Sequence, residues 1–168
     1  MKKMRVLFIG LFFAALGTAS YAQAPYTHSI GGITGFLYGA SYKTFIISDK
    51  LALQADLGTK LNVRSWSFWS LDLNPNAMYE QQIAKVDGLY WFAGGGISLG
   101  YMLSGRIYYS GFGYGRFGIN AIGGVEYKFK FPLTLQADFR PGYGLLFRKN
   151  ISDSYFDWGL NVSARYTF

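Results

Sequence analysis

The chain has 168 residues, enough for one domain, and its composition departs from that of soluble proteins. Charged residues make up 15% of it, whereas an ordinary soluble domain carries about 25%. Aromatic residues make up 20%, and so few charges cannot cover a surface that meets water on every side. The absence of cysteine excludes disulfides, thiolate metal sites, cysteine nucleophiles and a lipid-modified cysteine.

The first 22 residues have the pattern of a secretory signal peptide. Three basic residues precede an apolar run from Val6 to Leu16, and small and polar residues lead to Ala22. The run is shorter than the roughly 20 apolar residues that span a bilayer. We expect cleavage after Ala22 and a single barrel domain over residues 23–168. Loss of the three basic residues lowers the formal net charge from +7 to +4, too small an excess to indicate nucleic-acid binding.

The remaining chain alternates between apolar and polar residues. Over residues 51–64 the odd positions are almost all apolar, while the even positions are mostly polar or small. The same period of two recurs over 116–129, 133–140 and 156–168, and it indicates β-strands with one apolar face. The predicted strands are 28–36, 39–47, 51–64, 71–82, 88–101, 115–129, 133–147 and 155–168.

Two architectures fit these antiparallel strands: a soluble barrel with the apolar face inside, or a membrane barrel with that face outside. The long strands, the isolated charges set among glycines on the polar face, and the aromatic residues near strand ends all favour a membrane barrel. An even number of strands places both termini on the periplasmic side, which decides for eight strands over seven. The short connections at 48–50, 83–87 and 130–132 then face the periplasm. The connections at 37–38, 65–70, 102–114 and 148–154 face outward.

With these features the chain resembles the outer-membrane β-barrel class, whose members commonly end in an aromatic residue. The resemblance implies that Tyr166 and Phe168 belong to a signal for barrel assembly. In size and strand count the chain is similar to the small OmpA/OmpX-type barrels, and residues 35–43, 120–128 and 133–141 more closely resemble small outer-membrane proteins of the Bacteroidetes. The resemblance implies an outer-membrane location, contact with membrane lipid and lipopolysaccharide, and insertion by the barrel-assembly machinery. It implies no particular activity.

If the apolar face meets lipid, the charges of the polar face project into the lumen. The predicted lumen network consists of Asp56, Lys60, Arg64, Glu80, Arg116, Glu126, Lys128, Asp138, Arg140, Asp157 and Arg165. Buried charges are costly unless they are paired, and an eight-stranded barrel is just wide enough for side chains to fill it. We therefore expect a solid core of ion pairs with Lys60, Glu126, Asp138 and Arg140 at its centre. Lys43 is also assigned to the lumen.

Catalysis is not expected. Lipid-modifying and proteolytic chemistry generally uses histidine, and the one histidine, His28, lies at the start of the first predicted strand. No metal ion or cofactor is expected either. The preferred function is a structural or surface-interaction barrel of the outer membrane. The alternatives are a small-solute channel or transport accessory, and a soluble periplasmic ligand-binding barrel or lipid-modifying enzyme.

The longest predicted outer loop, 102–114, is rich in tyrosine and glycine. Tyrosine provides a large contact area at a low entropy cost, which suits a recognition surface. Arg106, Tyr108, Tyr109 and Tyr114 are therefore the candidate interaction residues.

Overall fold

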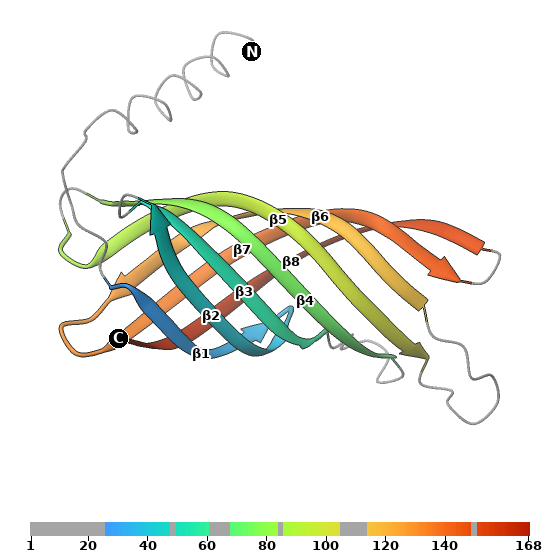
Figure 1. Ribbon diagram of the computed structural model, residues 1–168, viewed down its shortest axis with the longest axis horizontal. Helices are drawn as coiled ribbons and strands as arrows, with labels where there is room; N and C mark the ends of the chain where they lie inside the picture. The colour runs from blue at the N-terminus through green and yellow to red at the C-terminus, as the bar shows by residue number, and fades with distance from the viewer. Residues whose placement is uncertain (1–25, 48–49, 61–67, 84–85, 105–113, 149–150) are drawn as a thin grey trace, which may run out of the picture.

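The computed structural model describes residues 26–47, 50–60, 68–83, 86–104, 114–148 and 151–168. They form eight antiparallel strands closed into a barrel, as the alternation predicted (Figure 1). The strands are β1 (His28–Gly35), β2 (Tyr38–Ile47), β3 (Leu51–Thr59), β4 (Phe68–Gln82), β5 (Leu89–Ser104), β6 (Tyr114–Lys128), β7 (Leu133–Arg148) and β8 (Ile151–Thr167). Each strand pairs with its neighbours in the chain, and β8 pairs with β1 to close the ring. The predicted signal peptide, residues 1–22, and Arg64 lie outside the described residues.

Three predicted outer connections are wrong in part because strands continue into them, and the first is 65–70, where β4 already begins at Phe68. The stretch 148–154 is mostly strand, since Arg148 of β7 pairs directly with Ile151 of β8. Tyr114, assigned to the loop 102–114, belongs to β6 and pairs with Met102 of β5. The alternating residues extend the ladder for as long as a neighbouring strand supplies hydrogen bonds, so these strands reach further than predicted. β3 is the opposite case, because it ends at Thr59 and not at the predicted residue 64.

The strands fall into a short group and a long group. β1, β2 and β3 have 8 to 10 residues, whereas β4 to β8 have 15 to 17. The start of β1 and the C-terminus lie at one end of the barrel, which we call the inner end (Figure 1). At the opposite, outer end the long strands continue beyond the short ones as an open sheet of five strands.

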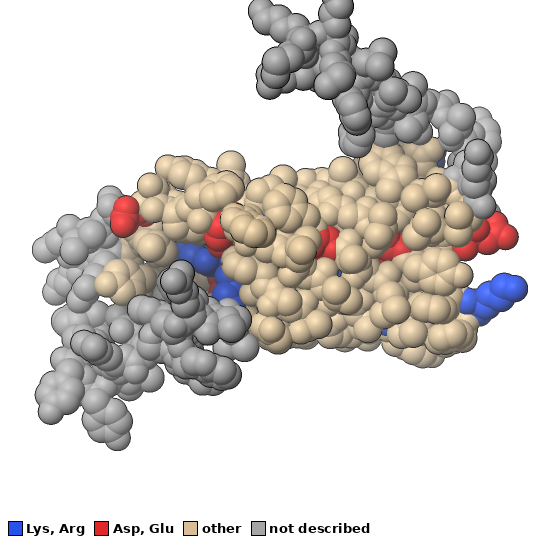
Figure 2. Space-filling model, turned by 180° about the vertical axis from the view of Figure 1, so that it is seen from behind, with Lys and Arg blue, Asp and Glu red and all other residues tan. Residues whose placement is uncertain are grey.

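The barrel is polar inside and apolar outside. Among the described residues, 22 polar or charged residues are buried, against seven apolar ones. The large exposed side chains include Leu71, Ile119, Trp158 and Leu160, each more than 60% exposed. On the face seen in Figure 2, the wall consists largely of uncharged residues, with a few acidic side chains visible between them. No helix within the described part of the chain is long and apolar enough to cross a membrane.

The turn between β1 and β2 folds into the lumen instead of outward. Gly35 has φ 120°, a left-handed conformation that favours glycine, and it redirects the chain there. Leu37 is only 2% exposed, and its backbone N–H donates to Oδ1 of Asn161 (2.9 Å). The Phe36 ring packs over Gly159, where a Cβ atom would clash with it. The turn, predicted at 37–38 as an outward connection, therefore closes the barrel from within.

Candidate functional site in the barrel lumen

The lumen holds three groups of charged residues, stacked from the inner end to the outer end. They are the inner cluster (Lys43, Glu80, Glu126, Arg165), the middle cluster (Asp56, Asp138, Arg140) and the outer cluster (Lys60, Asp72, Arg116, Asp157). Each of these residues makes at least one ion pair. Pairing offsets the desolvation of charges in a narrow interior, so the arrangement fits a filled barrel.

The inner cluster is centred on Glu126. Lys43 on β2 reaches both Glu80 and Glu126, at 3.1 Å from Oε2 of Glu126, and Arg165 on β8 binds the same oxygen. The hydroxyl of Tyr26, which precedes β1, donates to Oε1 of Glu126 (2.7 Å). Glu126 is fully buried and accepts bonds from two strands and from the segment before β1. Lys43 lies in the lumen as its assignment from the sequence proposed.

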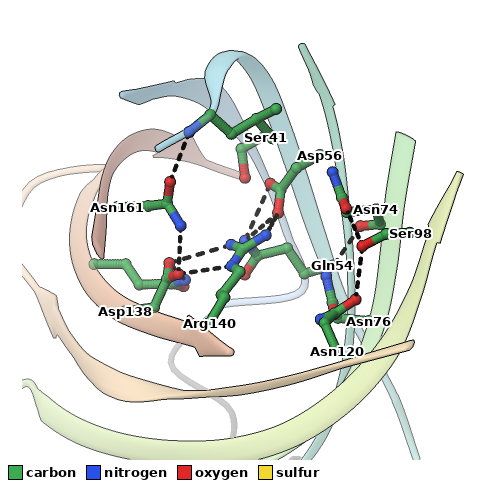
Figure 3. Close-up of polar contacts among 12 residues, drawn as sticks. Ser41, Gln54, Asp56, Asn74, Asn76, Ser98, Asn120, Asp138, Arg140 and Asn161 are labelled. Carbon is green, nitrogen blue, oxygen red and sulfur yellow. Dashed lines mark hydrogen bonds and ion pairs between the residues drawn. The ribbon is translucent and has the colours of Figure 1, made fainter. Parts of the chain in front are cut away.

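The middle cluster spans the lumen from β3 to β7 (Figure 3). Arg140 donates from Nη1 to Asp56 (2.6 Å) and from Nε to Asp138 (2.6 Å). Gln54 donates to Asp56 (2.9 Å), and Asn161 donates to Asp138 (3.0 Å). Bonds of this kind to a carboxylate are stronger than those between neutral groups. Each of the two carboxylates is therefore bound by the shared Arg140 guanidinium and by a side-chain amide.

Gln136 connects the middle cluster with the inner one. Its side-chain nitrogen donates to Asp138 (2.9 Å), and its carbonyl oxygen accepts a bond from Arg165. Arg165 also donates to the hydroxyl of Ser41 (3.0 Å). The network is therefore continuous between the two clusters.

The outer cluster is partly exposed. Oδ2 of Asp157 accepts from Lys60 (2.9 Å) and from Arg116 (3.2 Å), and Arg116 also binds Asp72. The Lys60 ammonium lies 4.5 Å from the centre of the Phe36 ring, a cation–π contact. Burial and the positive charge of Arg116 lower the pKa of Lys60, which follows the end of β3, while Asp157 opposes this shift.

Beside the middle cluster lies a neutral group on β4, β5 and β6 (Figure 3). Ser98 donates to Asn74 (2.6 Å) and contacts Asn120 (3.2 Å), and Asn120 donates to Asn76. Beside this group is a cavity of about 20 Å³, lined also by Phe36, Leu37, Lys60, Arg140, Asp157 and Asn161. That volume is enough for one water molecule.

The inner half of the lumen also holds a small apolar cluster, formed by Ala52, Met78, Phe92 and Ile122 with Phe45 beside it. The ammonium of Lys43 lies 5.4 Å from the ring centres of both Phe45 and Phe92. This cluster was not predicted from the sequence, although Ala52 and Ile122 occupy positions on the polar face of the alternation.

Most of the predicted network residues lie in these clusters, with two exceptions. Arg64 lies outside the described residues, and Lys128 sits at the inner rim. The Lys128 ammonium donates to the backbone carbonyls of Phe129 (2.8 Å) and Phe131 (2.9 Å) instead of to a carboxylate. It is the last residue of β6, so its long side chain reaches the turn, and the assignment of Lys128 to the network is wrong.

Asp72 is a network residue that the sequence analysis missed. It is fully buried, pairs with Arg116 and accepts a bond from Ser70 (2.5 Å). A signal was present, because Asp72 is separated from Glu80 by an even number of residues on the same strand, which places both side chains on one face.

The clusters carry no sign of a reactive centre. The carboxylates are engaged by cations, and no group of three metal-ligating side chains occurs among the described residues. The candidate assembly residues Tyr166 and Phe168 are exposed at the inner end, with ring centres 6.4 Å apart. Of the candidate interaction residues, Arg106, Tyr108 and Tyr109 lie outside the described residues.

Comparison with known proteins identifies a similar fold and nothing finer. No protein-family model and no curated protein matches the chain. Among solved structures, the crystal structure of Neisserial surface protein A (NspA) matches with a TM-score of 0.61 and 16% identity, over 84% of this chain and 94% of that one. At an identity this low, the structural similarity shows the fold alone, an eight-stranded barrel. None of the comparisons supports the resemblance to Bacteroidetes proteins.

Proposed function

We propose that the chain is an integral outer-membrane β-barrel, exported through a cleaved signal peptide, with a structural or surface-recognition role and no catalysis. The observation that carries this proposal is the inverted polarity of the barrel, with paired charges inside and large apolar side chains outside. A continuous apolar wall is unfavourable in water and favourable in lipid. The soluble alternative needs the opposite arrangement, with an apolar interior that receives a ligand.

The height of the apolar wall supports a membrane location. On β8 the outward residues run from Tyr166 through Val162 and Leu160 to Phe156, and all are more than half exposed. Ten residues of a strand tilted by about 45° rise roughly 25 Å, close to the apolar band of outer-membrane barrels. Tyrosine and tryptophan side chains near both limits suit the membrane interfaces.

A filled lumen argues for a structural role in place of transport. Ion pairs occupy three levels of the interior, and the Phe36–Leu37 turn lies between the middle and outer clusters. The cavity in between holds about 20 Å³, too little for a continuous water path. We expect no conductance above the lipid background in planar bilayers, and stable single-channel openings would favour the channel alternative.

The proposed partners follow from this location. They are outer-membrane lipid and lipopolysaccharide around the wall, and the barrel-assembly machinery at Tyr166 and Phe168. We also propose four surface-recognition residues, Arg106, Tyr108, Tyr109 and Tyr114. For the first three, the proposal rests only on the composition of the predicted loop 102–114. The resemblance to Bacteroidetes proteins likewise rests on sequence alone.

Cell fractionation tests the proposal. Cells expressing the full-length chain are fractionated, and the outer membrane is analysed by SDS gel electrophoresis with and without boiling. We expect a mature-length band in the outer membrane whose mobility changes on boiling, as for a closed barrel. Recovery in the soluble periplasm would contradict the membrane assignment. Retention of residues 1–22 in the mature protein would contradict the proposed cleavage.

A further inference from the structure

The outer part of β8 is an open edge of the sheet. β8 pairs with β1 only from Thr167 to Asn161, where Asn161 faces Gly35, and the last bond to the β1 side runs from Phe36 N–H to the Leu160 carbonyl (3.0 Å). On its other side β8 pairs with β7 as far as Ile151. From Ile151 to Gly159, β8 therefore has one strand neighbour within the described part of the chain (Figure 1).

Backbone groups at alternate positions of this stretch point away from β7. The carbonyl of Leu160 bonds the β1 side, and Phe168 exchanges both backbone bonds with His28 of β1. Because strand residues alternate in direction, Phe156 and Trp158 share that orientation. Their N–H and C=O groups are directed to the open edge. These are strong hydrogen-bonding groups that a further strand would satisfy.

This edge lacks several of the features that block strand addition, although it carries the two carboxylates Asp153 and Asp157. The β7–β8 ladder keeps one register from Leu133 opposite Tyr166 to Arg148 opposite Ile151, with no bulge. Residues 151–160 contain neither proline nor lysine, the residues that commonly protect edges. Among the described residues, the Asp153 carboxylate covers part of the edge by accepting the N–H of Ser154 (2.8 Å).

The side chains along the edge define the chemistry of a partner strand. Phe156 and Trp158 face outward and are 68% and 61% exposed. Tyr155 and Asp157 lie on the lumen side, and exposed Asp153 makes no ion pair with a described residue. Cross-strand neighbours pair by polarity and charge. We propose that an extended segment of a partner protein, alternating apolar and basic residues, adds to β8 as an antiparallel strand by backbone pairing.

A second copy of the chain cannot add to this edge as an antiparallel strand, an argument that rests on the proposed membrane location. Antiparallel pairing of two β8 strands would invert one barrel relative to the other, whereas copies inserted in one membrane point the same way. Within the described part of the chain, the edge of β4 beyond the Asp72–Gly58 pair spans only Phe68 to Leu71. It is too short to seat the outer stretch of β8.

A pair of variants at one position tests the proposal. Phe156→Pro removes one backbone N–H at the open edge and leaves the ladder to β7 intact, and proline is tolerated at edges. Phe156→Ala removes the same ring and keeps the N–H. The probe is a synthetic peptide that alternates valine and lysine. Its control is the same peptide with alternate backbone nitrogens methylated, which keeps the charge and abolishes strand pairing.

Binding is measured on the refolded, heat-modifiable barrel in detergent micelles, together with amide hydrogen exchange of residues 156 and 158. We expect the peptide to bind the wild type and Phe156→Ala and to slow exchange of both amides. Phe156→Pro and the methylated peptide should each weaken binding by about tenfold or more, the effect of losing hydrogen bonds at the edge. Asp153→Asn should weaken it less, in a salt-dependent manner.

Three outcomes would overturn the proposal: no binding to the folded wild type, equal binding by Phe156→Pro, or equal binding of the methylated peptide. A dimer of the barrel that Phe156→Pro dissociates would also overturn it, because a second copy would then occupy the edge. These measurements use the folded barrel in micelles and do not depend on the cellular compartment. Fractionation separately decides the proposed location, so the two failures are distinguishable.

Discussion

The guanidinium of Arg140 on β7 meets the carboxylate of Asp56 on β3 across the lumen, at 2.6 Å between Nη1 and Oδ2, although 84 residues separate them in the chain. The same guanidinium binds Asp138. One side chain therefore neutralises carboxylates from two walls of the barrel.

Replacing Arg140 should destabilise the barrel strongly. Arg140→Met leaves Asp56 and Asp138 buried without their cation, and removal of one partner of a buried ion pair costs about 3–5 kcal/mol. The free energy of unfolding is measured in urea on barrels folded in lipid vesicles. Lys130→Ala, at an exposed turn, serves as the control and should stay within about 0.5 kcal/mol of the wild type. Equal unfolding midpoints for the two variants would show that the middle cluster does not carry stability.

The two glutamates of the inner cluster should differ in importance. Glu126→Gln weakens contacts with Lys43, Arg165 and Tyr26, whereas Glu80→Gln weakens the contact with Lys43 alone. The other carboxylate oxygen of Glu80 has no hydrogen-bond partner among the described residues. We expect a loss of about 3 kcal/mol or more for Glu126→Gln and a smaller loss for Glu80→Gln. Urea unfolding of both variants under identical conditions tests this order, and the reverse order would contradict the placement of Glu126 at the centre.

The alternation along the strands predicts the face of each side chain and says less about its depth. Asp56, Glu126 and Arg165 lie in the lumen because strand side chains alternate with a period of two. Lys128 also follows this period, but as the last residue of β6 its ammonium reaches the turn carbonyls at the rim. Asp72 could have been assigned from the same period, since it shares a face with Glu80.

The closure by Phe36 and Leu37 could not be predicted from the sequence. An apolar pair in a turn between two strands carries no sign of its direction. Its inward position depends on Gly159 and Asn161, which are distant in sequence and brought alongside only when β8 pairs with β1. The pairing within the ion clusters has the same origin, because register around the closed ring decides which charges meet.

The contact between Phe36 and Gly159 should be sensitive to a single methyl group. A Cβ at Gly159 would overlap the Phe36 ring, so Gly159→Ala must displace the turn that closes the lumen. Overpacking of this kind costs about 1–3 kcal/mol. Gly123→Ala is the matched control, since its Cβ would lie 3.7 Å from the nearest atom, an ordinary contact. We expect lower urea stability for Gly159→Ala alone, and an unchanged Gly159→Ala barrel would exclude the tight turn packing.

The terminal aromatic residue should matter for assembly more than for stability. The Phe168 backbone exchanges two hydrogen bonds with His28, and both bonds persist in Phe168→Ala. Its ring is 61% exposed and, among the described residues, stacks on His28 and Tyr166 alone. We therefore expect the variant refolded in detergent to unfold within about 1 kcal/mol of the wild type. In cells, by contrast, the yield of heat-modifiable barrel should fall severalfold, because the ring belongs to the proposed assembly signal. Phe131→Ala, which removes a similarly exposed ring at the same end, should give normal yield. Equal yields from the two variants would leave Phe168 with no role in assembly. If Phe168→Ala instead loses stability in detergent to the same degree as it loses yield in cells, its effect belongs to packing at the β1–β8 seam.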